Sequence, residues 1–311
     1  MQQQTKSLSN EEAEELLKES FDHLTEGRYR IALQTAQKVF DARPNDFRAA
    51  ICVAWAHLEN NDPMNALENA DIAVNLGGEY PQTRLYRGFI LMRIGIFDGA
   101  IADLDIVISK RAQPLAWAHH LKAKALAGKG KYKEALAEFE SAVHEDKGAN
   151  KFYPKLKEWF SNAAGKTAPA KTTFLNKLVK KEAEPNTQML DEAEEAFKMK
   201  EYWYCIWAIR QILENPALKD YHKKAKILEL ECMTSLFQIK PALMKAEKYK
   251  NEFEDDEKFK SIYNKLLNLE NRKPTHKELE SSPAPKSENV KSISLTDQEP
   301  EAPKARDESK N

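Results

Sequence analysis

The stretch LYRGFILMRIGIFDGAIAD, residues 85–103, decides the fold, because it holds two apolar runs separated by a glycine turn. Gly88 stands inside the first run, Gly95 opens the turn, and Ala100 stands inside the second run. The alanine of the second run recurs at a step of 34 residues, with one inserted residue before the last copy: Ala32, Ala66, Ala100 and Ala135. A fixed period of this length is typical of chains built from helical hairpins.

Two other features keep the same step. Twelve residues before each alanine stands a small residue, in the order Ser20, Ala54, Gly88 and Ala123. Just before each alanine comes a turn sequence, in the order Gly27-Arg28-Tyr29, Asn61-Asp62-Pro63, Gly95-Ile96-Phe97 and Gly130-Lys131-Tyr132. A small residue lets two helices approach closely, and Gly or Asn permits a left-handed turn between them. The pattern therefore predicts pairs of helices joined by short turns.

This arrangement resembles the tetratricopeptide repeat family, in which a small residue, a helix-breaking turn, an aromatic residue, an alanine and a closing proline follow one another. The copies here diverge from it, because the closing proline is present only as Pro44. The resemblance implies antiparallel helix pairs that wind into a right-handed superhelix with a concave inner face. We therefore expect an all-α, TPR-like α-solenoid with a disordered C-terminal tail.

Composition agrees with this fold class and narrows the function. The chain has 41% hydrophobic and 31% charged residues, and its formal net charge is −1. That charge gives no whole-chain reason to bind nucleic acid or an anionic membrane. The start of the chain lacks the features of a secretion signal, and no apolar run is long enough to span a bilayer, so we expect a soluble cytoplasmic protein. Cys52, Cys205 and Cys232 lie far apart in sequence, and we interpret them as buried small hydrophobic residues in a reducing compartment.

The predicted organisation has five segments: a polar arm at 1–10, four TPR-like repeats at 11–149, a basic joint with short helices at 150–186, a C-terminal helical region with divergent TPR-like pairs at 187–271, and a disordered tail at 272–311. A further short helix is expected within the joint, at 173–182. In the C-terminal region we place the turn of the second helix pair near Ile239-Lys240-Pro241. The tail contains several prolines and no aromatic residue, so it cannot bury enough surface to offset the entropy of ordering.

A binding site is predicted from the resemblance, which implies that one side of the first helix in each pair lines an inner groove. The corresponding positions of the first three copies are all apolar: Leu17, Phe21, Leu24, Ile51, Trp55, Leu58, Leu85, Phe89 and Met92. Trp117 extends the set, and the fourth copy turns polar with His120 and Lys124. A contiguous apolar patch is a candidate contact surface, so we expect a non-catalytic adaptor or scaffold that holds a partner's hydrophobic peptide or helix. Two alternatives stay open: these side chains belong to the packed core, or the C-terminal helices or the tail fill the groove in cis.

Other chemistry is weakly indicated or absent. The positions at which some relatives grip a terminal carboxylate, Leu17, Phe21, Cys52, Gln82 and Tyr86, carry no positive charge, so we expect no such clamp. No spacing predicts a catalytic group, a metal site or a cofactor, and the tripeptide at 165–167 lacks the earlier glycine of a phosphate loop. Trp203 and Trp207 lie in a cluster too aromatic for one stripe and indicate a second surface. The alternative functions are a self-assembling homo-oligomeric scaffold, or a nucleic-acid or anionic-surface binder that uses the lysines and aromatics of residues 151–182.

Overall fold

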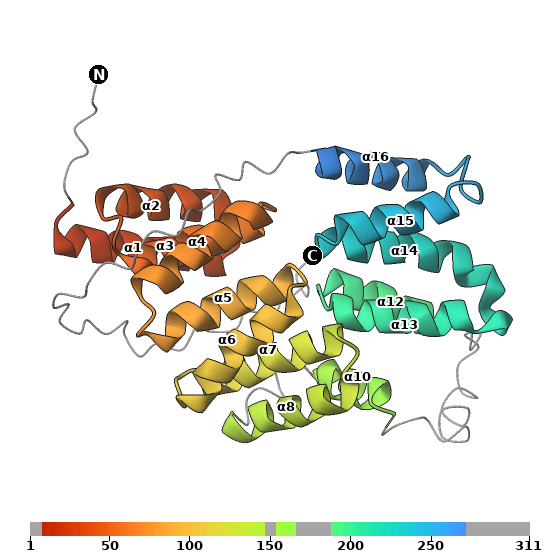
Figure 1. Cartoon of the computed structure of the whole chain (residues 1–311), viewed down its shortest axis with the longest axis horizontal. Coiled ribbons are helices and arrows are strands. Elements are labelled where there is room, and N and C mark those ends of the chain that lie inside the picture. The colour runs from red at the N-terminus through yellow and green to blue at the C-terminus, as the bar shows by residue number, and fades with distance from the viewer. Residues whose placement is uncertain (1–7, 147–153, 166–187, 272–311) are drawn as a thin grey trace, which may run out of the picture. The chain divides into compact units, whose positions relative to one another are not determined.

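The computed structural model describes residues 8–146, 154–165 and 188–271, and every regular element within them is helical. The helices of the repeat region are α1 (Asn10–Thr25), α2 (Tyr29–Ala42), α3 (Phe47–Glu59), α4 (Pro63–Leu76), α5 (Pro81–Arg93), α6 (Phe97–Ser109), α7 (Leu115–Gly128) and α8 (Tyr132–Glu145). They are followed by α10 (Pro154–Ala163), α12 (Gln188–Lys198), α13 (Tyr202–Glu214), the 3₁₀ helix η1 (Pro216–Tyr221), α14 (His222–Ser235), α15 (Ile239–Tyr249) and α16 (Glu257–Asn271). The all-α prediction is confirmed (Figure 1).

Antiparallel pairs are formed by α1 with α2, α3 with α4, α7 with α8, α12 with α13 and α14 with α15 (Figure 1). The turns of the repeat region fall where the 34-residue spacing predicts them. Gly27, Asn61, Gly95 and Gly130 all have positive φ, between 64° and 81°. This left-handed conformation closes each turn, because the amide after it reaches back to a carbonyl of the preceding helix. Each pair thus begins its second helix within a few residues of the end of its first.

The small residues lie where two helices of a pair approach. Ser20 and Ala32 are fully buried, and the Ser20 hydroxyl donates a 3.0 Å hydrogen bond to the Ala32 carbonyl oxygen across the α1–α2 pair. The equivalent Ala54 and Ala66 of the next pair are fully buried as well. A larger side chain at these places would separate the helices. The close approach therefore explains why small residues recur at these positions of the repeat.

The described residues divide by their contacts into two compact units. The first unit contains the described residues up to Ile90 together with Ile106–Pro114, and its cores are built by α1–α4 with part of α5. The second unit contains Leu91–Asp105 together with the described residues from Leu115 to Asn271. Among these residues, one hydrophobic cluster joins α7, α8, α10, α12, α13 and α14, and another joins α14, α15 and α16.

Part of the basic joint, helix α10, packs in the same hydrophobic cluster as α13. Leu156, Trp159 and Phe160 of α10 are 0–3% exposed. The Trp159 ring stacks on Tyr204 and the Phe160 ring stacks on Trp203, with centroid distances of 4.6 and 4.5 Å. These two rings pack in the protein core, so their faces are not available for stacking on bases. The joint's remaining predicted features, including the helix at 173–182, lie outside the described residues, as do most of the polar arm and the whole tail.

The divergent C-terminal pairs keep the turn geometry without its sequence signature. Lys200 precedes α13 and Phe237 precedes α15, and both have positive φ, 59° and 54°. The predicted turn near Ile239-Lys240-Pro241 is wrong by a few residues, because those three residues already form the first turn of α15. Proline is tolerated in a first helical turn, where its missing amide has no intrahelical partner.

Candidate functional site

Four aromatic rings form a continuous row across the first helices of the first unit. Phe21 of α1 meets Trp55 of α3 edge to face, with centroids 5.7 Å apart. Trp55 in turn contacts Tyr86 and Phe89 of α5, at 6.0 and 5.9 Å. These distances are within the range of favourable aromatic pairs. We call these four residues the aromatic stripe.

The 34-residue repeat builds this stripe. Phe21, Trp55 and Phe89 occupy the same position in successive copies, one residue after the buried small residue, so equivalent faces of three helices bring them into line. Phe21 and Trp55 are half-buried, whereas Phe89 is 9% exposed. Part of the stripe is therefore accessible, at the rings of α1 and α3.

Most of the other predicted groove residues are buried. Exposed fractions of 1–8% are found for Leu17, Leu24, Ile51, Leu58, Leu85 and Met92. Leu17 and Leu24 belong to the cluster that holds α1 to α2 and α3, and Ile51 packs with Ala50 and Ala73. Met92 and the half-buried Trp117 belong to the second unit. The stripe adds Tyr86, which the sequence pattern offered only as a candidate clamp position.

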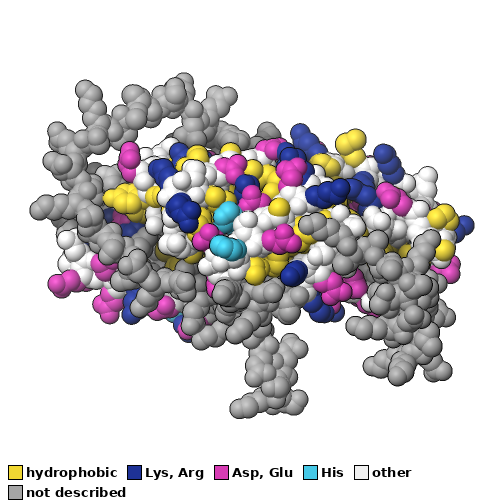
Figure 2. All heavy atoms as spheres, turned by 90° about the horizontal axis from the view of Figure 1, so that it is seen from below, with side chains coloured by type: hydrophobic (Ala, Val, Ile, Leu, Met, Phe, Trp, Pro, Cys, Tyr) yellow, Lys and Arg dark blue, Asp and Glu magenta, His cyan; other side chains and the backbone are white. Residues whose placement is uncertain are grey.

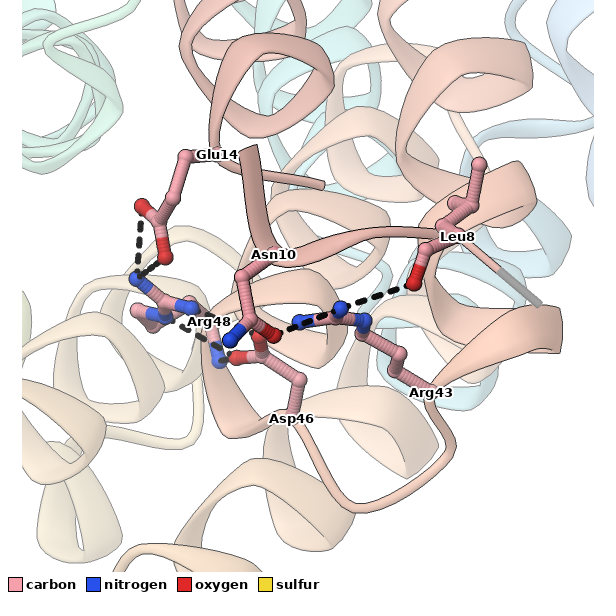
Figure 3. A network of polar contacts seen from close by, with 6 residues as sticks. All are labelled: Leu8, Asn10, Glu14, Arg43, Asp46 and Arg48. Atoms are coloured by element: carbon pink, nitrogen blue, oxygen red, sulfur yellow. Dashed lines mark hydrogen bonds and ion pairs between the residues drawn. The ribbon is translucent and has the colours of Figure 1, made fainter. Parts of the chain in front are cut away.

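An arginine at the start of α3, the helix that carries Trp55, is held by acidic neighbours (Figure 3). The Arg48 guanidinium of α3 donates to Asp46 at 2.7 Å and to Glu14 of α1 at 2.9 Å. The hydrogen bond to Asp46 raises the pKa of Arg48 above its ordinary value, against the opposing effect of burial, and the bond to Glu14 raises it further. Arg48 and Glu14 are one repeat apart, so this ion pair ties the first copy to the second. The charge of Arg48 is therefore offset by carboxylates of the same chain.

A second arginine anchors the start of the chain to the same region. One nitrogen of the Arg43 guanidinium donates to the Leu8 carbonyl oxygen and to the Asn10 side chain, both at 2.8 Å (Figure 3). Ser9 caps α1 through a reciprocal pair of bonds with Glu12. These contacts fix the position of α1 and hence of Phe21.

In the fourth copy, the predicted groove position Lys124 forms an ion pair with another part of the chain. The Lys124 ammonium of α7 lies 2.6 Å from a carboxylate oxygen of Glu201, at the start of α13. Glu201 is only 4% exposed, and its other oxygen accepts a 3.0 Å hydrogen bond from the indole N–H of Trp203. The positive charge of Lys124 is thus offset by a carboxylate of the same unit.

The same contact decides the position of Trp203. This ring is 7% exposed and lies between Phe160 and Glu201, so it packs within the second unit and leaves little surface for a partner. Trp207 is half-buried and stacks on Tyr204 at 5.1 Å. Of the two predicted residues, Trp207 keeps more of its ring accessible.

A shallow hollow of about 430 Å³ lies among α6, α7 and α8 of the second unit. Burial alone would lower the pKa of the Lys122 ammonium in its wall, but hydrogen bonds to Asp105 and Glu138 raise that pKa above its usual value. The Lys122 nitrogen lies 2.8 Å from Asp105 and 2.5 Å from Glu138. The lysines that line the hollow form ion pairs with neighbouring carboxylates. The hollow therefore does not present a surface of a single charge sign. Figure 2 likewise shows acidic, basic and hydrophobic side chains interspersed on the face in view.

No group of three His, Cys, Asp or Glu side chains within the described residues is arranged to hold a metal ion. None of the described helices has the length and apolar character that a membrane crossing requires.

No family model and no curated protein sequence matches the chain. Among solved structures, it is similar to pilF of Pseudomonas aeruginosa at 12% identity and a TM-score of 0.42, with 82% of this chain and 98% of that chain covered. A tetratricopeptide repeat protein from Parabacteroides merdae matches at 13% identity and a TM-score of 0.43, with 83% and 100% covered. PilW, a type IV pilus biogenesis factor, matches at 12% identity and a TM-score of 0.41, with 82% and 99% covered. The chain's own 34-residue spacing, left-handed turns and paired helices give it a tetratricopeptide-type fold.

Proposed function

We propose that this protein is a non-catalytic adaptor that binds an apolar segment of a partner protein on the aromatic stripe. The observation that carries the proposal is the row of Phe21, Trp55 and Phe89 across three successive repeats. Aromatic rings supply large contact area at low entropic cost and dominate many protein interfaces. The half-buried rings of Phe21 and Trp55 are the contact points.

The chemistry of the surroundings favours an uncharged apolar ligand segment. The Arg48 guanidinium of α3 is already paired with Asp46 and Glu14, so a partner's carboxylate would have to compete with these two groups for it. An amphipathic helix with residues i, i+3 and i+4 on one face matches a row of rings that runs across parallel helices. The neighbouring buried leucines then serve to hold the stripe in place.

Two alternatives have different consequences. In a self-assembling scaffold the stripe would pair with a second copy, which a concentration-dependent change in sedimentation would reveal. Binding of nucleic acid or an anionic surface has less support, because Trp159 and Phe160 of the basic joint are buried and the net charge is −1. The cytoplasmic location stays a prediction.

The test compares two lysine substitutions in the full chain. Phe21→Lys places a charge on the stripe at its half-buried edge, and Met64→Lys places the same charge on α4, where Met64 is 53% exposed and outside the stripe. Proteins captured from extracts of the native cells are quantified for each variant. A synthetic peptide of the recovered binding segment is then titrated against all three proteins.

We expect the dissociation constant of that peptide to rise about 10- to 30-fold for Phe21→Lys, as for a buried aromatic contact, and to stay unchanged for Met64→Lys. Circular dichroism and a thermal unfolding curve verify that both variants are folded. Equal affinity of the wild-type protein and a folded Phe21→Lys variant would exclude the stripe as the binding site.

A further inference from the structure

Two cysteines that are distant in sequence meet inside the second unit. Cys205 of α13 and Cys232 of α14 are 27 residues apart, and their sulfur atoms are 2.9 Å apart. Both side chains are 0% exposed, and both are free thiols. A disulfide bond is about 2.05 Å long, so a shift of less than about 1 Å separates this contact from a covalent bond.

The surroundings of the pair limit the chemistry that it can support. Both cysteines belong to a buried hydrophobic cluster that also contains Ala208, Ile209 and Leu228. Metal binding by two thiolates would require further ligands, and no group of three potential ligands occurs among the described residues. The reaction left to two adjacent thiols is their oxidation to a disulfide.

We propose that Cys205 and Cys232 form a latent disulfide site, which cross-links α13 to α14 when the chain meets a small-molecule disulfide such as glutathione disulfide. This inference is independent of the proposed function. One cysteine thiolate attacks the glutathione disulfide, forms a mixed disulfide and releases one glutathione. The other cysteine thiolate attacks the protein sulfur of that mixed disulfide and releases the second glutathione. Two cysteine thiols are oxidised, one disulfide is reduced to two thiols, and the two protons pass to the released glutathione.

Burial controls when this reaction occurs. Burial raises the pKa of the Cys232 thiol well above its ordinary value, and the contact with Cys205 raises it further. The thiolate is the nucleophile, so the closed α13–α14 pair resists exchange. Oxidation therefore takes place before the pair folds or during local opening, and the cross-link then stabilises the closed pair.

Cys52 provides an internal control. It is buried in the first unit, and burial raises the pKa of its thiol to about 12, while the other two cysteines contact each other. It shares the low reactivity of the pair and lacks the second sulfur. Any cross-link specific to the pair must therefore leave Cys52 reduced.

The experiment refolds the full-length protein from denaturant in a glutathione redox buffer, blocks the remaining thiols by alkylation and maps the peptides without reduction. We expect a peptide that joins Cys205 to Cys232, a mass loss of two hydrogen atoms and an alkylated Cys52. The unfolding midpoint should rise by about 5–10 °C, since the cross-link closes a loop of this length in the unfolded chain. In Cys232→Ala, the cross-link and the rise in the midpoint should both disappear.

Two results would overturn the proposal. The first is that Cys205 and Cys232 carry thiols or separate glutathione adducts in the same proportion as Cys52. The second is that the cross-link forms but lowers the unfolding midpoint, because the folded α13–α14 pair would then not accommodate the bond.

Discussion

Substitutions in the ion pair between Lys124 and Glu201 test how much this contact between α7 and α13 stabilises the protein. Glu201→Gln keeps the side-chain shape and an oxygen that can accept from the Trp203 indole, but it removes the negative charge. The Lys124 ammonium, 2.6 Å from the carboxylate and 16% exposed as a side chain, would lose the negative charge that Glu201 contributes. Only the charge interaction between α7 and α13 is thus perturbed.

The magnitude follows from burial. Breaking a fully buried ion pair by removing one partner costs about 3–5 kcal/mol, because the other charge stays buried without compensation. Glu201 is 4% exposed, but Lys124 retains some contact with solvent, so we expect about 2–3 kcal/mol of lost stability. Lys124→Met combined with Glu201→Gln removes both charges and should recover most of this loss.

Urea unfolding followed by circular dichroism measures the free energy of unfolding of the wild-type protein, both single variants and the double variant. The double-mutant cycle isolates the interaction of the two side chains. A loss below about 0.5 kcal/mol for Glu201→Gln, or a coupling energy near zero, would mean that the ion pair between Lys124 and Glu201 does not stabilise the protein.

Further predictions concern the turn before α8 and a buried histidine. Gly130→Ala should destabilise the protein by about 1–2 kcal/mol through backbone strain alone, because Gly130 has a φ of 78° and its added Cβ would meet nothing within 4 Å. Gly128→Ala should cost about 1–3 kcal/mol for a different reason, since its Cβ would lie 2.4–2.8 Å from the Phe97 ring. Adding Phe97→Leu should relieve Gly128→Ala and leave Gly130→Ala unchanged, and equal behaviour of the two in thermal unfolding would contradict this distinction. Burial, and secondarily the charge of Lys124, lowers the pKa of His120 well below 6.5. The unfolded chain therefore takes up a proton that the folded chain does not, so stability should fall as pH drops below about 6.5, by up to about 1.4 kcal/mol per pH unit. His120→Gln should flatten that part of the stability curve, and parallel curves for the two proteins would refute the assignment.

The repeat could be predicted from the sequence because its conformational requirements are local. Gly27, Gly95 and Gly130 provide the left-handed turn residue that each helix pair needs. Lys200 and Phe237 adopt the same conformation in the divergent pairs, at a cost that packing of the neighbouring helices offsets. Their turns give little sequence signal, and for this reason the position of the α14–α15 turn was misplaced.

The candidate site could be predicted only in part. The repeat spacing aligned Phe21, Trp55 and Phe89 without any structural information. It could not say which apolar side chains would be covered, because burial depends on how neighbouring pairs pack. Leu17 and Ile51 belong to the same apolar pattern as Trp55, yet they lie in hydrophobic clusters.

Contacts between distant parts of the sequence lay beyond any periodic pattern. Lys124 and Glu201 belong to elements separated by α8, α10 and α12, and the pairing of Cys205 with Cys232 depends on the packing of α13 against α14. Each of these contacts satisfies a polar or reactive group by burying it against a partner in the same chain.

The distribution of these internal pairs bears on how the protein would select a ligand. Arg48 in α3 and Lys124 in the fourth copy both form ion pairs with carboxylates of the chain itself. A partner that carried a matching charge would have to displace an existing ion pair, and its gain would be offset by the charge left unpaired. On the proposed function, an apolar segment would displace only water from the rings of Phe21 and Trp55. Shape and hydrophobic burial would therefore favour it over an acidic or basic peptide. If acidic peptides bound as well as neutral ones, with an affinity that fell steeply with salt, the internal pairing of Arg48 would not govern selection.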